Sequence, residues 1–113
     1  MVRRGEIYLV DWSPGRGSEQ SGIRPALVIQ NDLGNQFSAT TIVAAISTQW
    51  RRVYPFQVLI SALENGLPQD SIVKLELIQT IAQTRLGRLM GTLNTTKMPE
   101  IDQAILRSLG LDG

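Results

Sequence analysis

The sequence predicts a mainly β (α+β) fold: a small antiparallel barrel or sandwich with one helix at its C-terminal end. Two observations predict this class. Six short runs rich in apolar and β-branched residues lie between residues 5 and 93, separated by turns that contain Gly, Pro or Asn. Only the last segment changes to a helical period. Several strands at short spacing followed by one terminal helix favour a closed or double-layered sheet with the helix on one side.

The first half of the chain predicts three strands. Residues 5–12, "GEIYLVDW", form the first, and "SPG" ends it. Residues 13–23 make a connection that is long for a hairpin, and long loops in compact domains are commonly functional. The second strand spans 24–30 and places Pro25, which lacks a backbone N–H, at its start or on an edge. Residues 31–38 predict a turn with one short helical turn.

Residues 39–48, "ATTIVAAIST", contain many β-branched residues and no polar face until the end. This pattern predicts a central strand that is buried on both sides. A further strand at 54–60 and a connector at 61–70 follow. Residues 71–83 alternate over an unusual length and predict either one bent strand or two. The run 88–93 completes the β region.

The last element has the period of a helix. Its apolar residues recur at intervals of three and four positions: Met98, Ile101, Ile105 and Leu109. Pro99 falls in the first turn, where its missing N–H costs nothing. Thr95 or Thr96 is expected to cap the helix, and Gly110 to end it.

Length and composition predict one globular domain over residues 1–113, with 42% hydrophobic and 19% charged residues. The sequence has no cysteine and no histidine, which excludes thiolate chemistry and the commonest general acid–base side chain. A metal site would have to use carboxylates alone, and no acidic pair has ligand-like spacing, so we expect no metal and no cofactor. No apolar run approaches the roughly 20 residues of a membrane span, and residues 1–10 lack a signal-peptide segment, so we expect a cytoplasmic protein.

The net charge is only +1, yet nine of the eleven cationic residues are Arg. The planar fork of Arg suits phosphate better than the point charge of Lys. Six of these arginines form three adjacent or nearly adjacent pairs, which either solvate the surface or bind phosphate: Arg3 and Arg4, Arg51 and Arg52, Arg85 and Arg88.

Three places in the sequence contain residues that could carry chemistry. Arg24 directly precedes Pro25, which favours an extended backbone and aims the side chain from a fixed strand start. The buried run at 39–48 ends in Ser47 and Thr48, whose hydroxyls are expected to point to opposite faces. Beside an Arg, such a hydroxyl can hold a phosphate oxygen. Residues 50–56, "WRRVYPF", mix aromatics with Arg, as expected where bases stack, although Trp50 taken alone is expected in the core.

The stretches "RRGEIYLVDWSP", "GSEQSGIRPALVIQND" and "ISTQ....YPFQV" occur in this order, and with them the chain resembles the MazF/PemK family of toxin endoribonucleases. The resemblance covers the chain from Arg3 to the terminal helix. It implies an SH3-like β-barrel, a homodimer, and metal-independent cutting of single-stranded RNA at short sequences. It also implies a MazE-like antitoxin that occupies the RNA groove.

The resemblance also implies roles for particular residues. The catalytic Arg of the family corresponds to Arg24, and its catalytic hydroxyl residue, usually Thr, corresponds to Ser47, with Thr48 as the alternative one position away. The residues implied to bind RNA are Ser18, Glu19, Gln20, Thr48, Arg51, Phe56 and Gln79. The ribose 2′-OH would attack the adjacent phosphorus, and the proton acceptor would be solvent, Glu19 or a strongly perturbed Arg24.

Two other functions remain open from the sequence. A CcdB-like toxin of the same fold binds DNA gyrase and cuts nothing, but residues 107–113 contain no aromatic side chain for such a contact. The other alternative is a barrel that binds RNA or protein without catalysis, and the presence of Ser in place of Thr at position 47 is its one support.

Overall fold

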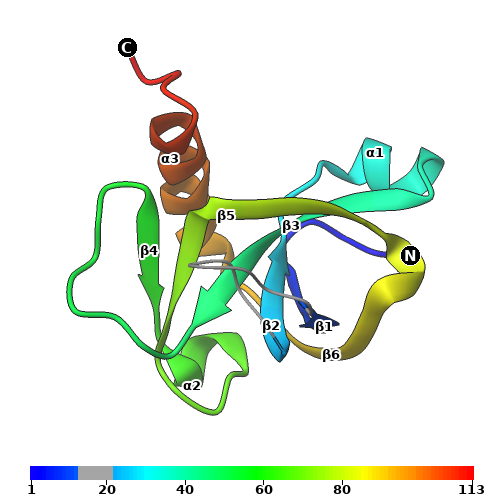
Figure 1. The fold of residues 1–113 in the computed structure, drawn as a ribbon, viewed down its shortest axis with the longest axis horizontal. Helices are drawn as coiled ribbons and strands as arrows, with labels where there is room; N and C mark the ends of the chain where they lie inside the picture. Colours follow the sequence, from blue (N-terminus) through cyan, green and yellow to red (C-terminus); the bar gives the residue numbers. More distant parts are fainter. Residues whose placement is uncertain (13–21) are drawn as a thin grey trace.

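A computed structural model describes residues 1–12 and 22–113 of the chain. Six strands form one antiparallel sheet in the order β4-β5-β3-β2-β1-β6 (Figure 1). The strands are β1 (Glu6–Asp11), β2 (Ile23–Val28), β3 (Thr40–Ser47), β4 (Gln57–Ile60), β5 (Ser71–Ala82) and β6 (Leu86–Thr92). The helices are α1 (Asp32–Phe37), α2 (Ala62–Asn65) and α3 (Met98–Ser108), with short 3-10 turns at Gln83–Arg85 and Thr95–Lys97. The predicted class, mainly β with a C-terminal helix, is confirmed.

β3 is the central strand that its sequence predicts, with Val43, Ala44, Ala45 and Ile46 at most 1% exposed. Alternate residues of this strand enter two different cores. Ala44 and Ile46 pack in the cluster that includes the buried face of α3, and Val43 and Ala45 pack in the cluster on the opposite face. Because both faces of β2 and β3 are buried, neither strand can shift without exposing apolar surface.

β5 is one bent strand, which settles the alternatives left by its sequence. Ala44 of β3 pairs with Ile78, whereas the next residue, Ala45, pairs with Lys74, so three residues of β5 bulge from the ladder. In Figure 1, β5 first runs beside β4 and then bends to cross the top of the view. The bend curls the sheet, so that Leu77 and Ile81 of β5 share a core with Val10 of β1.

A buried amide holds the connection between β2 and β3. Asn35 of α1 is 2% exposed; its Oδ1 accepts from Thr41 Oγ1 at 2.7 Å and from Gln30 Nε2 at 3.0 Å, and its Nδ2 donates to the Gln30 carbonyl at 3.0 Å. Gln30 follows β2 and Thr41 lies in β3, so these bonds fasten the end of one strand to the beginning of the next. They act together with the backbone bond from the Ile29 N–H to the Ile42 carbonyl, 2.9 Å, to set the β2–β3 register.

The sequence predicts the end of α3 correctly but not the residue that caps its beginning. Asn94, not Thr95 or Thr96, provides the side-chain cap, and it caps the 3-10 turn before the helix; Lys97 at the helix N-cap makes no such bond. The predicted end is confirmed, because Gly110 has φ of 71° and its N–H donates to the Arg107 carbonyl.

Two further expectations, the start of β4 and the burial of Trp50, are wrong, and one connection contains a short helix that the sequence did not predict. β4 begins at Gln57 instead of residue 54, because Pro55 lacks an N–H and the Tyr54 carbonyl accepts from the Gln57 N–H in a turn. The connector 61–70 contains α2, capped by Ser61. Trp50, expected in the core, is 38% exposed, because the chain leaves the sheet after β3.

No helix of the described residues is long and apolar enough to span a membrane.

We predict that Asn35→Ala lowers the free energy of unfolding by about 3 kcal/mol, because it leaves the fully buried Thr41 hydroxyl without its acceptor and removes one of the two bonds that the Gln30 amide nitrogen donates. Urea unfolding measures the loss. Gln36→Ala, at an exposed position of the same helix, is the matched control. Adding Thr41→Val to Asn35→Ala should cost less than the sum of the two single changes. Equal stability of the Asn35 and Gln36 variants would contradict this role.

Candidate active site

Arg24 and Ser47 lie at the point where the ladder between β2 and β3 ends. The ladder pairs Val28 with Val43 and Ala26 with Ala45, and no pair follows it toward Arg24. Continuing the same register by two residues places Arg24 opposite Ser47. Residues that are opposite in antiparallel strands point to the same face, so these two side chains share a face. Pro25, between Arg24 and Ala26, has no N–H with which to continue the ladder.

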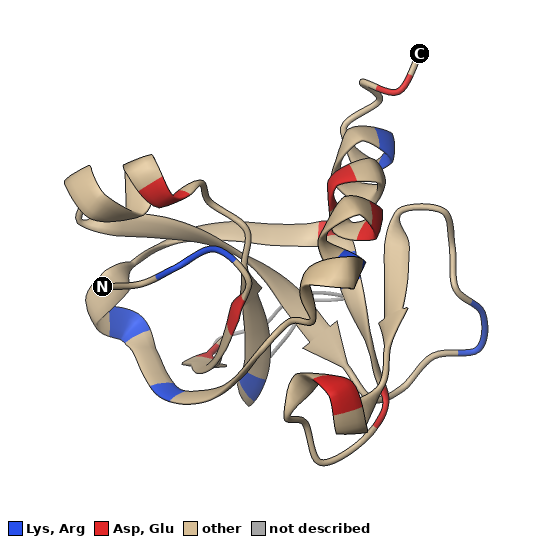
Figure 2. Cartoon of the chain, turned by 180° about the vertical axis from the view of Figure 1, so that it is seen from behind, with Lys and Arg blue, Asp and Glu red and all other residues tan. Residues whose placement is uncertain are grey.

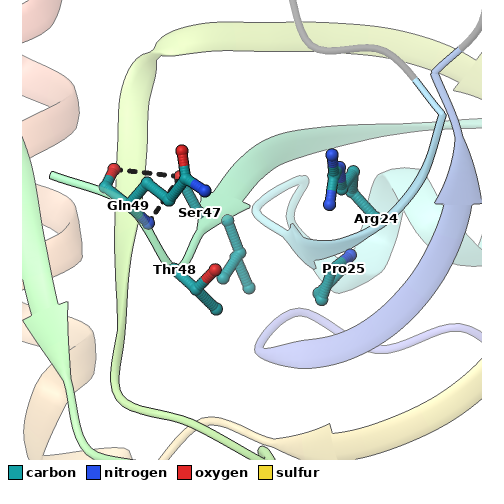
Figure 3. Close-up of a pocket in the computed structure, with 6 residues that line it drawn as sticks. Arg24, Pro25, Ser47, Thr48 and Gln49 are labelled. Atoms are coloured by element: carbon teal, nitrogen blue, oxygen red, sulfur yellow. Dashed lines mark hydrogen bonds between the residues drawn. The ribbon is translucent and has the colours of Figure 1, made fainter.

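The two strands separate here, and a hollow of about 160 Å³ opens between their ends. Arg24, Pro25, Ile46, Ser47, Thr48 and Gln49 line it. Figure 3 shows Arg24 and Ser47 rising from one side of the strands, with Pro25 and Thr48 turned toward the other side. Ser47, the last residue of β3, shares the face of Arg24 by strand register, whereas Thr48 lies in the bend after β3 and also lines the hollow.

The Ser47 hydroxyl is held by a tight turn at the end of β3. Its Oγ accepts from the Gln49 N–H at 3.1 Å and donates to the Gln49 carbonyl, also at 3.1 Å (Figure 3). This arrangement fixes the position of the oxygen and directs its proton to a backbone carbonyl. To donate to a ligand in the hollow, the hydroxyl must rotate away from the Gln49 carbonyl while it keeps the bond from the N–H.

The chemistry of this hollow suits an anion. Arg24 is exposed and carries a guanidinium with five N–H donors, and the neighbouring hydroxyls can donate as well. Such a set matches the oxygens of a phosphate group. Among the described residues, no three acidic side chains come together in a way that would hold a metal ion.

The remaining predicted RNA-binding residues fall into two groups. Ser18, Glu19 and Gln20, with most of the predicted functional loop at 13–23, lie outside the described residues. Arg51 lines a second hollow, described below, and Phe56 is half-buried and stacks on Tyr54. Gln79 lies opposite Val43 in the β3–β5 ladder, exposed and on the same face as Ser47. Four residues of strand separate Val43 from Ser47, about 13 Å, so Gln79 does not line the hollow itself.

A second hollow lies beside the first, at the segment 50–56 where the sequence predicted base stacking. It has a volume of about 260 Å³, and Gln49 lines both hollows. Trp50, Arg51, Arg52, Tyr54, Gln57 and Lys74 line it as well. The aromatic and Arg residues of the segment 50–56 gave the sequence signal for this site, and the part that sequence reasoning missed is its floor. Lys74 and Gln57 gave none, because only the β4–β5 register brings them together.

In each of the other two arginine pairs, one side chain binds a structural partner. Arg4 donates from Nη2 to Asp102 Oδ1 at 2.6 Å and from Nε to the Ile29 carbonyl, which ties α3 to β2. Arg85 donates from Nη2 to the Asp11 carbonyl at 2.8 Å and so ties the turn before β6 to β1. The pair at 51 and 52 differs, because it lines a hollow next to the candidate active site.

The fold is a small, curled antiparallel sheet with a C-terminal helix. At the open end of its two strands β2 and β3, an arginine and a serine hydroxyl line a hollow whose chemistry suits an anion. This combination of fold and site defines the class of protein. The sequence model that matches the chain, over residues 3–109, is described as PemK-like, MazF-like toxin of type II toxin–antitoxin system. This chain belongs to that toxin family.

Solved structures agree with this assignment over nearly the whole chain. An endoribonuclease in complex with its cognate antitoxin, from a mycobacterial species, is 25% identical and covers 100% of this chain and 99% of its own, with a TM-score of 0.84. The Mycobacterium tuberculosis toxin MazF-mt6 is 28% identical and covers 96% and 99%, with a TM-score of 0.79. MazF from Deinococcus radiodurans, 20% identical over 96% of both chains with a TM-score of 0.80, shares the fold.

We predict that Ser47→Ala, Ser47→Thr and Arg24→Ala fold normally. The two positions lie at the open edge of the sheet and are half-buried and exposed, respectively, so each change should alter the free energy of unfolding by no more than about 1 kcal/mol. Thermal and urea unfolding of the three variants against the wild-type chain measures this. A loss of several kcal/mol for Arg24→Ala would show that this side chain supports the fold.

Proposed function

We propose that this toxin is an endoribonuclease that cuts single-stranded RNA at specific sequences without a metal ion. The observation that carries the proposal is the position of Arg24 and Ser47 on one face of the open end of β2 and β3. Membership of the toxin family supports it, as do the mycobacterial relatives that are endoribonucleases. The comparisons give no support to the alternative of a CcdB-like toxin that binds gyrase.

The proposed reaction is transfer of a phosphoryl group within the RNA. The ribose 2′-oxygen attacks the adjacent phosphorus, the bond from phosphorus to the 5′-oxygen breaks, and the products end in a 2′,3′-cyclic phosphate and a 5′-hydroxyl. Arg24 binds the phosphate oxygens and neutralises the charge that develops on them. Ser47 donates a further hydrogen bond there after its proton leaves the Gln49 carbonyl.

The two protons of the reaction need separate partners. The guanidinium of Arg already carries its proton near neutral pH, so it is a poor acceptor for the proton of the 2′-OH. In this proposal the 2′-OH loses its proton to solvent or to Glu19. Arg24 then supplies the proton that the leaving 5′-oxygen needs, and solvent returns it.

The proposal includes the setting in which the toxin acts. A cognate antitoxin of the MazE type would cover the site, as expected for a relative of the mycobacterial endoribonuclease that was solved in complex with its antitoxin. The toxin would act in the cytoplasm as a homodimer, in which each protomer contributes the basic segment at 51–52 to one RNA track.

Purified, antitoxin-free protein in EDTA should cut a long defined RNA at discrete sites and leave DNA of the same sequence intact, because DNA lacks the 2′-hydroxyl nucleophile. Primer extension maps the cuts, and sensitivity of the 3′ ends to phosphatase only after acid opening of the cyclic phosphate identifies the end chemistry. Intact RNA after incubation with folded protein would overturn the proposed activity.

Variants at three positions that line the hollow, 24, 47 and 48, test the assigned roles. Arg24→Ala should lower the cleavage rate by about 10³-fold or more, and Ser47→Ala by about 10²- to 10³-fold, because each removes a donor to the developing charge. Ser47→Thr keeps the hydroxyl and should cut at nearly the wild-type rate. Thr48→Ala should lose less activity than Ser47→Ala, because Ser47, and not Thr48, lies opposite Arg24 when the β2–β3 register is continued. Single-turnover rates on one RNA measure all four variants, and the reverse order at 47 and 48 would contradict the assignment.

A further inference from the structure

The second hollow lies directly beside the candidate active site. Gln49 lines both hollows, and its backbone is fixed by the two bonds to the Ser47 hydroxyl. A ligand bound at Arg24 and Ser47 therefore has only one residue between it and this second space. Figure 2 shows the basic stretch of the β3–β4 connection standing apart from the acidic residues of α2 and α3, so it is free to face a polyanion.

Three side chains at alternate positions of this connection form one stack. The rings of Tyr54 and Phe56 are parallel within 7°, with centroids 5.5 Å apart, and Arg52 Cζ lies 5.2 Å from the centroid of Tyr54. The stack holds the Arg52 guanidinium over an aromatic surface while Arg52 itself stays exposed. A guanidinium has two flat faces, and a nucleobase can stack on the face that Tyr54 does not cover.

Polar groups lie on the floor of the same hollow. Gln57 is 9% exposed and its carboxamide is fixed: Oε1 accepts from the Tyr54 N–H at 3.1 Å and Nε2 donates to Glu76 at 2.8 Å. A carboxamide has two N–H groups and two lone pairs on its oxygen, so one of each remains for a ligand. Lys74 pairs with Gln57 in the β4–β5 ladder and lines the hollow as a further donor.

We propose that this second hollow is a base-binding subsite, in which an unpaired RNA base next to the scissile phosphate stacks on Arg52 and Trp50 and has its edge read by Gln57 and Lys74. The volume of about 260 Å³ is somewhat below the range of about 300–1,000 Å³ typical of drug-sized ligands, as suits a single base. The inference rests on the proposed endoribonuclease activity and adds to it: these residues decide which base is accepted at one position beside the cut.

The variant Arg52→Lys separates stacking from charge, because it keeps the positive charge and removes the plane. Cleavage of an RNA library randomised around the cut should show that this variant loses the base preference at one flanking position and keeps it at the others. Tyr54→Ala should do the same, and Tyr54→Phe, which keeps the ring beneath Arg52, should restore the preference. Arg88→Lys, an exposed arginine on the opposite edge strand, is the matched control.

A binding measurement keeps the test independent of cleavage. Trp50 is 38% exposed and the second tryptophan, Trp12, is 9% exposed, so a base that stacks in the hollow should quench the fluorescence of Trp50. The probe is a short RNA of the preferred sequence, or of mixed sequence if the wild type cuts nothing, with 2′-O-methyl groups that prevent cleavage. Quenching should be absent in Trp50→Phe, and Arg52→Lys should weaken binding about tenfold.

Each result has one consequence. If the wild type binds the probe in this manner but cuts no RNA, the endoribonuclease proposal fails and the base subsite stands. If the wild type cuts RNA and Arg52→Lys retains both the full base preference and the full affinity, the subsite is wrong and the activity stands. A uniform loss of rate in Tyr54→Ala with every base preference intact would also overturn the subsite, because it would indicate a purely structural role.

Discussion

The register of β2 against β3 is the constraint on which the site depends. Arg24 and Ser47 come from segments more than 20 residues apart, and they share a face only because Ala26 lies opposite Ala45. A slip of one residue would turn one of the two side chains to the other face of the sheet. The buried amide of Asn35 prevents such a slip, because it binds residues on both sides of the connection, and the cores on both faces oppose it as well.

The same two strands stabilise the fold in one half and open in the other. Ala26, Val28, Val43 and Ala45 pack in one core, and the β2–β3 ladder ends at the Ala26–Ala45 pair, directly beside Pro25. The site is therefore carried on rigid strands but lies beyond their last pair, where polar side chains remain accessible. Substitutions there should affect chemistry more than stability, which is why the roles of Arg24 and Ser47 can be separated experimentally from folding.

Because the net charge of the chain is only +1, its affinity for RNA must depend more on where its cationic side chains lie than on how many there are. Arg4 and Arg85 are used internally, to tie α3 and the turn before β6 to the sheet. Arg24 and the pair at 51–52 lie around two adjoining hollows that share Gln49. One hollow offers hydrogen-bond donors for a phosphate, and the other offers flat side chains and a fixed carboxamide for a base. Cleavage of the RNA and recognition of the base beside the cut can therefore take place in adjoining sites.

The sequence by itself determined the fold class, the central position of β3, the limits of most strands and the Gly110 end of α3, because these follow from local periodicity and backbone preferences. It also indicated Arg24 and Ser47, through a family resemblance in contiguous motifs. Only the tertiary structure decided what depends on contacts between distant segments. The face shared by Arg24 and Ser47 comes from strand register, the exposure of Trp50 from the path of the chain after β3, and the pairing of Gln57 with Lys74 from the β4–β5 ladder.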